Sequence, residues 1–491
     1  MKRLKPIMFV GTGSDVGKSL LATGFCRIFL QDGYSPAPFK AQNMALNSYA
    51  TPDGKEIGRA QAVQAEAAGI DCHTDMNPIL LKPSGELSSQ VVINGKPVGD
   101  CKAWEYFRND GKKELRKIAH NAFDRLNGCF NPIVLEGAGS ISELNLREGD
   151  IVNMSMAEHA DANVILVGDI DRGGVFASVY GSVMLQSPQD RKRIKGIIIN
   201  KFRGDLKLFE DGKKIIEDIC GIPVLGVVPM ASHFQIDEED SVVLSVKNKQ
   251  ISKNKINVAV ILLKHISNFT DFTRLEKHPG VNLFYATDPD DLKEAEIIII
   301  PGSKNTISDM LFLRKSGFAA AIMEAREKEK TIMGICGGYQ MMGELISDPE
   351  GIENNIKELP GLGLLPVKTV LGSVKETRQV KFHFFNSNKI CEGYEIHMGR
   401  SSSPFPFITF EDGRKDGCLV DNRCFGTYIH GILDNMPVIE YLLNRYMKSP
   451  ESEINDRDWK SYKNHQYDLL ADFLREHLDI ERIYKLMEKD D

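Results

Sequence analysis

Short apolar runs alternate with polar, helix-prone segments through much of the first half of the chain. Several of these runs are rich in β-branched residues and end at a glycine, a carboxylate or an amide, as buried strands of α/β proteins do. Repeated strand–helix units of this kind predict a parallel, doubly wound α/β sheet with its binding sites at the carboxyl ends of the strands. The runs lie at residues 7–10, 133–135, 164–167, 196–199 and 223–229.

A second set of apolar runs begins after a polar, cationic stretch at residues 245–256, which we interpret as a linker. These runs predict a second α/β unit, and they lie at residues 257–262, 297–300, 331–333 and 424–429. The end of the chain is charged and helix-prone. We therefore expect an N-terminal domain (1–245), a second domain (255–448) and a C-terminal helical extension (449–491).

Composition narrows the classes of function. The chain has 491 residues, 42% of them apolar and 26% charged, which is ordinary for a globular protein of more than one domain. A formal net charge of −7 without a dominant basic block argues against a nucleic-acid partner. Nine cysteines without a C-x-x-C pair argue against a disulfide framework, and no apolar run reaches the ~18 residues of a membrane span. We expect a cytoplasmic protein with no membrane partner.

The first apolar run leads into Gly-Thr-Gly-Ser-Asp-Val-Gly-Lys-Ser at residues 11–19, and an apolar helix follows. In a phosphate-binding loop of this kind, backbone N–H groups at the helix N-terminus surround phosphate oxygens. The strict pattern has glycine at position 12, where this chain has threonine. The alternative is a glycine-rich turn that binds no ligand. The candidate nucleotide-binding residues of the loop are Gly13, Gly17, Lys18 and Ser19.

Two other strand ends carry polar groups suited to a nucleotide site. Glu136 ends a strand before a tight glycine turn, where a second Mg²⁺ ligand beside Ser19 belongs. Asn200 follows another strand, in an Asn-Lys-x-x sequence similar to the base-reading loop of several phosphate-loop families. Each side chain could instead cap a helix or hold a turn. The prediction depends on several polar groups falling at strand ends in order.

In the second domain, Gly-Ile-Cys-Gly-Gly-Tyr-Gln at residues 334–340 lies between an apolar strand and a predicted helix. A cysteine flanked by small residues at such a turn is typical of a nucleophile elbow. The thiol of Cys336 could form a thioester with an amide substrate if a base and an oxyanion site lie nearby. His430 is the candidate base, and the Pro-Gly-Ser turn that contains Gly302 is the candidate oxyanion hole. The alternative is a buried cysteine in a glycine-rich turn.

Neutral amides are dense between residues 37 and 110. Gln61 and Gln64 recur there at helical spacing. The amides could contact a substrate rich in amides and carboxylates, or they could be caps and solvated surface, and the spacing does not decide between the two. The candidate substrate contacts are Gln42, Asn43, Asn47 and Gln61, with Asp171 from a later strand end.

The order of the Pro-Gly-Ser turn, the Cys336 elbow and the Gly-Thr-Tyr-Ile-His-Gly sequence around His430 resembles a class I glutamine amidotransferase domain. The phosphate loop is similar to the variant loop of the dethiobiotin synthetase family, whose members activate a carboxylate with ATP. The two domains together resemble the cobyric acid synthase family, over roughly residues 5–445. The most specific stretches are residues 38–48, 76–83, 136–140, 169–174 and 393–400.

This resemblance implies an amidoligase that uses ATP, Mg²⁺ and glutamine. Its members amidate the b, d, e and g carboxylates of adenosylcobyrinic acid a,c-diamide, a corrinoid polycarboxylate of cobalamin biosynthesis. ATP would convert each carboxylate to an acyl phosphate, with Lys18, Ser19 and Glu136 stabilising the transfer. Asn200 would pair with the adenine.

On the glutamine side, the resemblance implies that Cys336 and His430 release ammonia through a glutamyl thioester, with the N–H groups of Gly302 and Gly337 binding the oxyanion. Most triad amidotransferases carry His-x-Glu, in which the glutamate orients the imidazole. Here glycine and isoleucine follow His430, so the expected third member is absent. The group that orients His430 is left open.

Three other interpretations are considered beside this one. A nucleotide-controlled switch of the partitioning type would carry an extra lysine near the start of the loop, and positions 12–16 hold none. A sister amidoligase could act on another polycarboxylate. A binding module with an inactive amidotransferase fold is disfavoured because Cys336 and His430 are both present.

Overall fold

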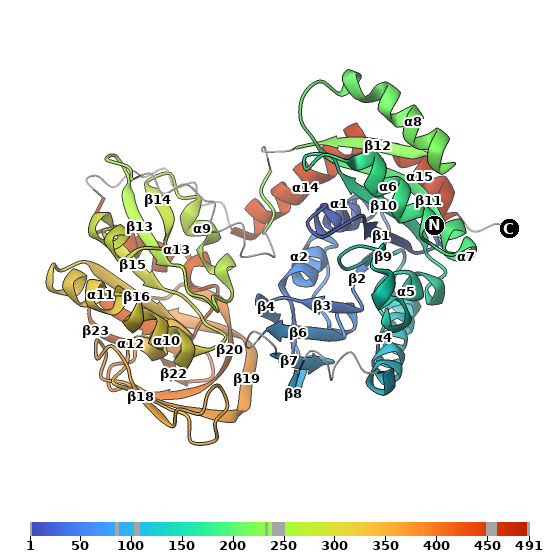
Figure 1. The fold of residues 1–491 in the computed structure, drawn as a ribbon. Coiled ribbons are helices and arrows are strands. Elements are labelled where there is room, and N and C mark those ends of the chain that lie inside the picture. Colours follow the sequence, from blue (N-terminus) through green and yellow to red (C-terminus); the bar gives the residue numbers. More distant parts are fainter. Residues whose placement is uncertain are drawn as a thin grey trace.

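The computed structural model describes residues 2–83, 88–102, 109–230, 234–237, 251–385, 387–447 and 459–488. Two α/β domains lie side by side in Figure 1, the first in blue to green and the second in yellow to orange. The predicted fold class, two doubly wound α/β domains, is confirmed by the order and direction of the strands. Residues 245–250 of the predicted linker and the predicted domain ends at 245 and 448 lie outside the described residues, so these boundaries stay predictions.

The first domain is built on a six-stranded sheet of order β12-β11-β10-β1-β9-β2, in which neighbouring strands are parallel. On β1, Ile7 and Phe9 pack in one hydrophobic cluster and Met8 and Val10 in another, so both faces of the sheet are covered. The strands are β1 (Ile7–Gly11), β2 (Ala37–Phe39), β9 (Ile133–Glu136), β10 (Asn163–Asp169), β11 (Ile194–Phe202) and β12 (Val224–Pro229). The helices are α1 (Lys18–Gln31), α2 (Arg59–Ala67), α4 (Asn109–Cys129), α5 (Met154–His159), α6 (Val175–Met184), α7 (Pro188–Arg193) and α8 (Glu210–Cys220), with the 3-10 helices η2 (Leu144–Gly149) and η3 (Leu206–Phe209).

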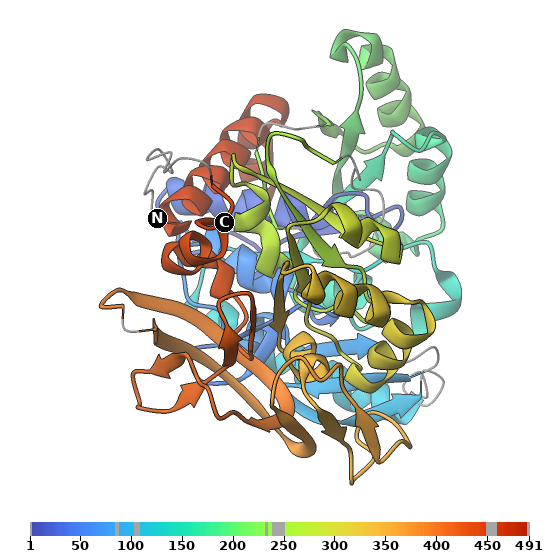
Figure 2. The same ribbon diagram turned by 90° about the vertical axis from the view of Figure 1, so that its left-hand side faces the viewer.

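The C-terminal segment returns to this first domain. Leu470 and Leu474 of α14 (Trp459–His477) join the hydrophobic cluster that contains Phe25 of α1, and α15 (Ile480–Met487) extends the same contact. Figure 2 shows these red helices beside the blue first domain. The predicted C-terminal extension is thus helical where it is described, and it completes the core of a domain far from it in sequence. Across the described residues, every helix is too short or too polar to traverse a lipid bilayer.

Two small sheets extend the first domain within the amide-rich region. One has the order β3-β6-β7-β8, and in the other β4 and β5 form an antiparallel pair. The strands are β3 (Gln42–Met44), β4 (Ser48–Ala50), β5 (Glu56–Gly58), β6 (Ile79–Pro83), β7 (Ser88–Ile93) and β8 (Lys96–Lys102), with the 3-10 helix η1 (Thr74–Met76).

The second domain is built on a sheet of order β14-β13-β15-β16-β24-β23, parallel except for the edge strand β23. This is the strand order of flavodoxin-like sheets with one strand added. The strands are β13 (Ile256–Ile261), β14 (Val281–Ala286), β15 (Ile297–Ile300), β16 (Thr331–Ile335), β23 (Cys418–Asp421) and β24 (Cys424–Thr427). The helices are α9 (Thr273–Glu276), α10 (Thr306–Lys315), α11 (Phe318–Glu327), α12 (Gly337–Met342) and α13 (Met436–Leu443), with the 3-10 helices η5 (Phe269–Phe272), η6 (Pro289–Glu294) and η7 (Ile432–Asp434).

Between α12 and β23 the second domain carries a further, mostly antiparallel sheet that the sequence analysis did not predict. Its long hairpin of β19 and β20 lies at the junction with the first domain (Figures 1 and 2), where the side chain of Gln379 donates to the carbonyl oxygen of Ala50 at 2.9 Å. The strands are β17 (Leu345–Ser347), β18 (Glu358–Pro360), β19 (Lys368–Phe384), β20 (Ile390–Ser402), β21 (Ile408–Phe410) and β22 (Lys415–Asp416).

Candidate functional site

Cys336 occupies the turn between β16 and α12. Its backbone has φ 51° and ψ −107°, a conformation that L residues rarely adopt, so the residue is held in a strained turn. The side chain is buried, with Sγ 3.6 Å from the carbonyl oxygen of Ile396. Glycine is needed at position 338, because a Cβ on Gly338 would lie 1.9 Å from the carbonyl oxygen of Ile300. The turn has the geometry of the nucleophile elbow expected from the sequence.

His430 follows β24, which pairs with β16 beside the elbow. Its Nδ1 lies 2.7 Å from Oδ2 of Asp271, and Oδ1 of Asp271 accepts the backbone N–H of Gly431 at 2.8 Å. The thiol of Cys336 is a second hydrogen-bond partner of the His430 ring. Asp271 therefore stands where the sequence lacked a third member. We call Cys336, His430 and Asp271 the cysteine site.

The charges around His430 favour its protonated form. Burial opposes the imidazolium, but the carboxylate of Asp271 and the thiol of Cys336 outweigh burial and raise the pKa of His430 to about 10. At neutral pH the ring is therefore an imidazolium. The thiol of Cys336, the candidate nucleophile, therefore lies beside a cation.

The two candidate oxyanion glycines lie in neighbouring turns. A Cβ on Gly337 would lie 2.8 Å from the backbone nitrogen of Ser303, in the turn that contains Gly302. A Cβ on Gly302 would lie 3.0 Å from Cε1 of His430. Gly302 and Gly337 thus border the Cys336–His430 pair at positions where a larger residue would force a shift.

The predicted phosphate loop runs from β1 into α1. Gly17 has φ 98°, which favours glycine, and a Cβ there would lie 2.1 Å from Nδ2 of Asn200. Nζ of Lys18 donates to the carbonyl oxygens of Gly13 at 2.9 Å and Gly139 at 3.0 Å. Lys18 is the first residue of α1. Its ammonium group is therefore near the N-terminal N–H groups of the helix, and both favour an anion.

Glu136 is buried at the end of β9, next to this loop. Its Oε1 accepts hydrogen bonds from Ser19 and Lys40, both at 2.8 Å, and its Oε2 accepts one from Gln64 at 2.6 Å. Burial alone would raise the pKa of Glu136, but the ammonium of Lys40 and these hydrogen bonds hold it below its ordinary value. We call Lys18, Ser19, Lys40, Gln64 and Glu136 the phosphate site.

The donor set of the phosphate site fits a magnesium ion. The Ser19 hydroxyl and the Glu136 carboxylate are adjacent oxygen donors of the kind that Mg²⁺ prefers. Within the described residues there is no cluster of three or more His, Cys, Asp or Glu that could hold a metal ion by itself. Mg²⁺ commonly takes only one or two protein ligands and completes its shell with phosphate oxygens and water, so two ligands suffice.

Asn200 lies within β11, two residues before its end and not after the strand as expected from the sequence, and its Nδ2 donates to the carbonyl oxygen of Val16 at 2.8 Å. The side chain is buried and so fixes the conformation of the phosphate loop. An amide nitrogen carries two protons, which leaves one for a second acceptor. Its contact with adenine stays a prediction.

Three of the candidate substrate contacts lie together in the first domain. Asn43 donates to Oε1 of Gln61 at 3.1 Å, and both side chains are buried, while Gln42 precedes Asn43 in β3. Within the described residues, Nε2 of Gln61 is buried and has no hydrogen-bond partner. A buried donor without a partner is costly, so this position is suited to a ligand oxygen or a water molecule.

The other two candidates lie elsewhere. Asn47 is buried at the junction of the domains, where its Oδ1 accepts the backbone N–H of Phe269 at 3.3 Å. Asp171 is exposed and pairs with Arg203. The structure therefore brings three of the five candidates together and not the other two.

Comparison with known proteins decides the family. Residues 257–438 match a CobB/CobQ-like glutamine amidotransferase domain, and residues 7–243 match a CobQ/CobB/MinD/ParA nucleotide binding domain. The chain is 59% identical to the cobyric acid synthase of Phocaeicola vulgatus, with 100% of both chains covered. The chain belongs to the cobyric acid synthase family. It is also 56% identical to the cobyric acid synthase of Parabacteroides distasonis, over 98% of this chain and 99% of that one.

Solved structures match parts of this cobyric acid synthase family member only weakly. The structure of PurLQS from Thermotoga maritima is 19% identical with a TM-score of 0.31, and the match covers 39% of this chain and 100% of that one. Signal recognition particle receptor FtsY from Elizabethkingia anophelis is 14% identical with a TM-score of 0.29, over 49% of this chain and 64% of that one. Scores of this size add nothing to the assignment.

Membership of the cobyric acid synthase family makes the chain a glutamine-dependent amidoligase. The partitioning switch and the inactive binding module are thereby set aside. The sequence analysis missed Asp271 and Lys40. The only sequence signal for Lys40 was that it follows a short apolar strand, just as Glu136 ends one. The only signal for Asp271 was that a carboxylate lies between two aromatic residues, Phe269 and Phe272.

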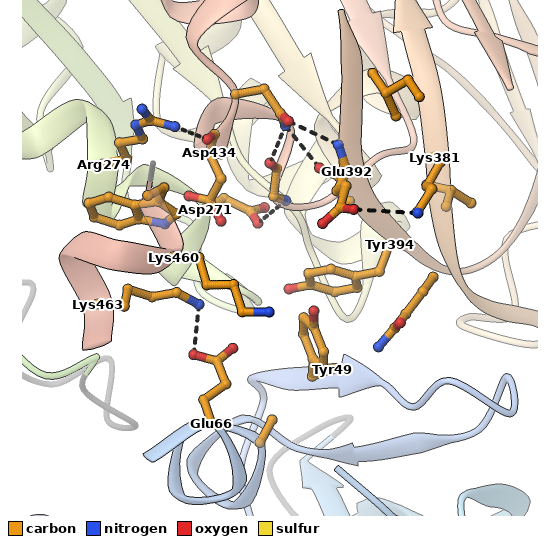
Figure 3. Close-up of a pocket in the computed structure, with 18 of the residues that line it drawn as sticks. Tyr49, Glu66, Asp271, Arg274, Lys381, Glu392, Tyr394, Asp434, Lys460 and Lys463 are labelled. Atoms are coloured by element: carbon orange, nitrogen blue, oxygen red, sulfur yellow. Dashed lines mark hydrogen bonds and ion pairs between the residues drawn. The ribbon is translucent and has the colours of Figure 1, made fainter. Parts of the chain in front are cut away.

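A cleft of about 1000 Å³ lies where the two domains and α14 meet (Figure 3). Figure 3 shows Tyr49 of the first domain pointing towards Tyr394 of the second. Asp271 and Tyr394 line the cleft, and His430 is buried behind them. In this cobyric acid synthase family member, the cysteine site therefore borders the space between the domains.

Proposed function

We propose that the chain catalyses the ATP- and glutamine-dependent amidation of the b, d, e and g carboxylates of adenosylcobyrinic acid a,c-diamide, in the cytoplasm. The observation that carries this proposal is the presence of the cysteine site and the phosphate site in one chain. Amidation of a carboxylate needs an activating phosphoryl group and a nitrogen nucleophile, and the two sites supply one each. Full-length identity to cobyric acid synthases supports the choice of substrate.

At the phosphate site, an oxygen of the substrate carboxylate attacks the γ-phosphorus of ATP, and ADP leaves. Lys18 and Lys40 neutralise the charge on the transferred phosphoryl oxygens. Mg²⁺ held by Ser19 and Glu136 would add Lewis-acid stabilisation of the phosphate oxygens. Ammonia then attacks the carbonyl carbon of the acyl phosphate, inorganic phosphate leaves, and the amide forms.

At the cysteine site, the thiolate of Cys336 attacks the side-chain carboxamide carbon of glutamine. The N–H groups of Gly302 and Gly337 stabilise the oxyanion, and the imidazolium of His430 gives its proton to the departing ammonia. The neutral imidazole then takes a proton from water, which hydrolyses the glutamyl thioester and releases glutamate. Ammonia is thus produced in the protein that consumes it.

Recognition of nucleotide and substrate falls to the first domain. The second proton of Asn200 Nδ2 would be donated to a ring nitrogen of adenine. Gln61, with Gln42 and Asn43 beside it, would bind an oxygen of the corrinoid periphery, because its buried Nε2 lacks a partner within the described residues. A carboxylate or amide oxygen of the substrate has the right chemistry for that contact.

The test incubates the purified full chain with ATP, Mg²⁺, glutamine and the corrinoid a,c-diamide. Mass spectrometry then counts the carboxylates converted to amides, while ADP and glutamate are measured in parallel. We expect four amides per corrinoid, with one ADP and one glutamate formed for each. Amidation of a different polycarboxylate, with the a,c-diamide untouched, would establish the sister amidoligase instead.

A further inference from the structure

Asp271 lies on a tight turn that begins at Asn268. Asn268 has φ 54° and ψ 41°, a left-handed conformation that asparagine adopts more readily than most residues. Its carbonyl oxygen accepts the N–H of Asp271 at 3.0 Å, which closes the first turn of η5. The position of the Asp271 carboxylate therefore depends on how Asn268 is held.

Two hydrogen bonds from the first domain hold this turn. The backbone N–H of Ser48 donates to Oδ1 of Asn268 at 2.9 Å, and the backbone N–H of Phe269 donates to Oδ1 of Asn47 at 3.3 Å. Asn47, Ser48 and Asn268 are all buried, so little water competes for these bonds. The amide-rich segment of the first domain thus contacts the residues next to Asp271.

A third contact reaches the other side of His430. The centroid of the Tyr49 ring, in β4, lies 4.6 Å from the centroid of the Tyr394 ring (Figure 3). The Tyr394 ring stacks on the His430 ring, with 5.3 Å between the ring centroids. The backbones of Tyr394 and His430 also exchange hydrogen bonds of 2.9 and 3.0 Å. Strand β4 and the preceding residue, Asn47, therefore contact the Asn268–Asp271 turn on one side of the His430 ring and Tyr394 on the other.

We propose that Asp271 is the positioning residue for His430, and that Asn47 and Ser48 of the first domain hold the Asn268–Asp271 turn in place. The cysteine site is then complete only when the two domains are docked. The proposal rests on the assignment of Cys336 and His430 to glutamine hydrolysis made above. Its consequence is that the amidoligase domain controls the release of ammonia in the other domain.

The same segment of the first domain reaches the phosphate site. The β4–β5 hairpin leads into α2, whose Gln64 donates to Glu136. At the junction, buried Glu56 of β5 pairs with Lys82 of its own domain at 2.8 Å and with Lys375 of β19. Removing one member of such a buried cluster is costly, so the hairpin is fixed to both domains. A shift of α2 at the phosphate site has a short path to Asn268.

The first experiment tests the positioning role with Asp271→Asn in the full chain. Asp271, Cys336 and the ring of Tyr394 face His430, and Asp434 and Arg59 are charged neighbours of this group. We expect kcat for glutamine hydrolysis to fall about 10²- to 10⁴-fold, with KM for glutamine within about 2-fold. The alkaline limb of the pH profile moves towards neutral pH, because the imidazolium loses its anionic partner. An unchanged kcat and pH profile would overturn the positioning role.

The second experiment tests the contribution of the first domain with Asn268→Gly, which keeps the left-handed backbone accessible but removes the accepting oxygen. We expect kcat for glutamine hydrolysis to fall about 10-fold or more, with the pH profile shifted as in Asp271→Asn. Asn268→Asp retains the oxygen and should recover most of the activity. The matched control is Gln379→Ala, which removes another hydrogen bond across the same junction and should stay within about 2-fold of wild type.

Four outcomes separate the possibilities. Combining Asn268→Gly with Asp271→Asn should be no worse than Asp271→Asn alone, because both act through one carboxylate; additive losses would overturn the proposal. An equal loss of glutamine hydrolysis in Asn268→Gly and Gln379→Ala would also overturn it. Loss of ammonium-dependent synthesis in Asn268→Gly would overturn it too, because the effect would then come from general unfolding. Glutamine hydrolysis that survives Cys336→Ala would instead refute the assignment of the cysteine site.

Discussion

At the phosphate site, Lys18 follows the loop after β1 and Glu136 ends the neighbouring strand β9. The cysteine site instead combines three separate segments of the chain, which carry Cys336, His430 and Asp271. The phosphate site is assembled within the first domain, from the ends of neighbouring strands of one sheet and from helices α1 and α2. The cysteine site also needs a turn that the other domain helps to hold. The difference teaches that all the catalytic residues of an active site can belong to one domain while their geometry depends on contacts from another.

The largest effect that would sharpen this comparison is expected from Lys18→Ala. Synthesis should fall more than about 10³-fold with glutamine or ammonium as nitrogen source, because the cation facing the transferred phosphoryl group is lost. Glutamine hydrolysis should stay within about 2-fold, since the cysteine site keeps all its contacts. Amide and glutamate formation are measured in the same reactions. Lys5→Ala, which removes only a surface ion pair with Asp161 at the other end of β1, is the control.

Synthesis by the Lys18→Ala enzyme above about a tenth of the wild-type rate at saturating ATP would show that the phosphate-loop assignment is wrong. A large loss of glutamine hydrolysis as well would show that Lys18 also contributes to the chemistry of the cysteine site.

A smaller effect is expected from Asn200→Ala. The variant loses the bond to the Val16 carbonyl oxygen and the proposed contact with adenine, so KM for ATP should rise about 10-fold. The preference for ATP over other nucleoside triphosphates should narrow, and glutamine hydrolysis should not change. Initial rates with ATP and GTP measure both quantities. A raised KM with an unchanged base preference would leave Asn200 with only its structural role in the loop.

The smallest effect concerns stability and pH. The folded-state pKa of His430, about 10, lies above the 6.5 of a free histidine. Protonation therefore stabilises the fold fully below about pH 6.5, and this contribution is lost as the pH rises through about 10. We expect the Tm difference between wild type and His430→Gln to be larger by about 3 °C or more at pH 6 than at pH 10. Thermal melts at both pH values measure it, and a pH-independent difference would contradict the imidazolium.

Much of the fold could be predicted because its central strands are short and apolar, so a few consecutive residues are enough to identify each one. The run at residues 164–167, for example, lies inside β10 (Asn163–Asp169). The hairpin of β19 and β20 could not be predicted in this way. Buried and exposed positions alternate only at the two ends of β19, because its middle faces the first domain. A strand that packs against another domain loses the simple period of two.

The candidate residues divide in the same way. Lys18 and Cys336 lie on turns whose glycines and flanking strands are visible within a few residues of sequence. Asp271 lies 159 residues from His430 along the chain, and only the sheet of the second domain brings them to 2.7 Å. The turn that carries Asp271 depends in addition on Asn47 and Ser48 of the first domain. No local sequence pattern predicts a contact between residues of two different domains.

The division of labour between the two sites is tested most directly by Cys336→Ala, assayed with glutamine and, separately, with high ammonium at alkaline pH. The account predicts that glutamine-dependent synthesis is lost while ammonium-dependent synthesis stays within about 2-fold of wild type, because the phosphate site is intact. Cys391→Ala, at a buried cysteine of the same domain whose pKa burial raises to about 11, should retain both activities. Loss of ammonium-dependent synthesis in a folded, ATP-binding Cys336→Ala enzyme would contradict the account, since Cys336 would then belong to the synthetase chemistry or to the structure.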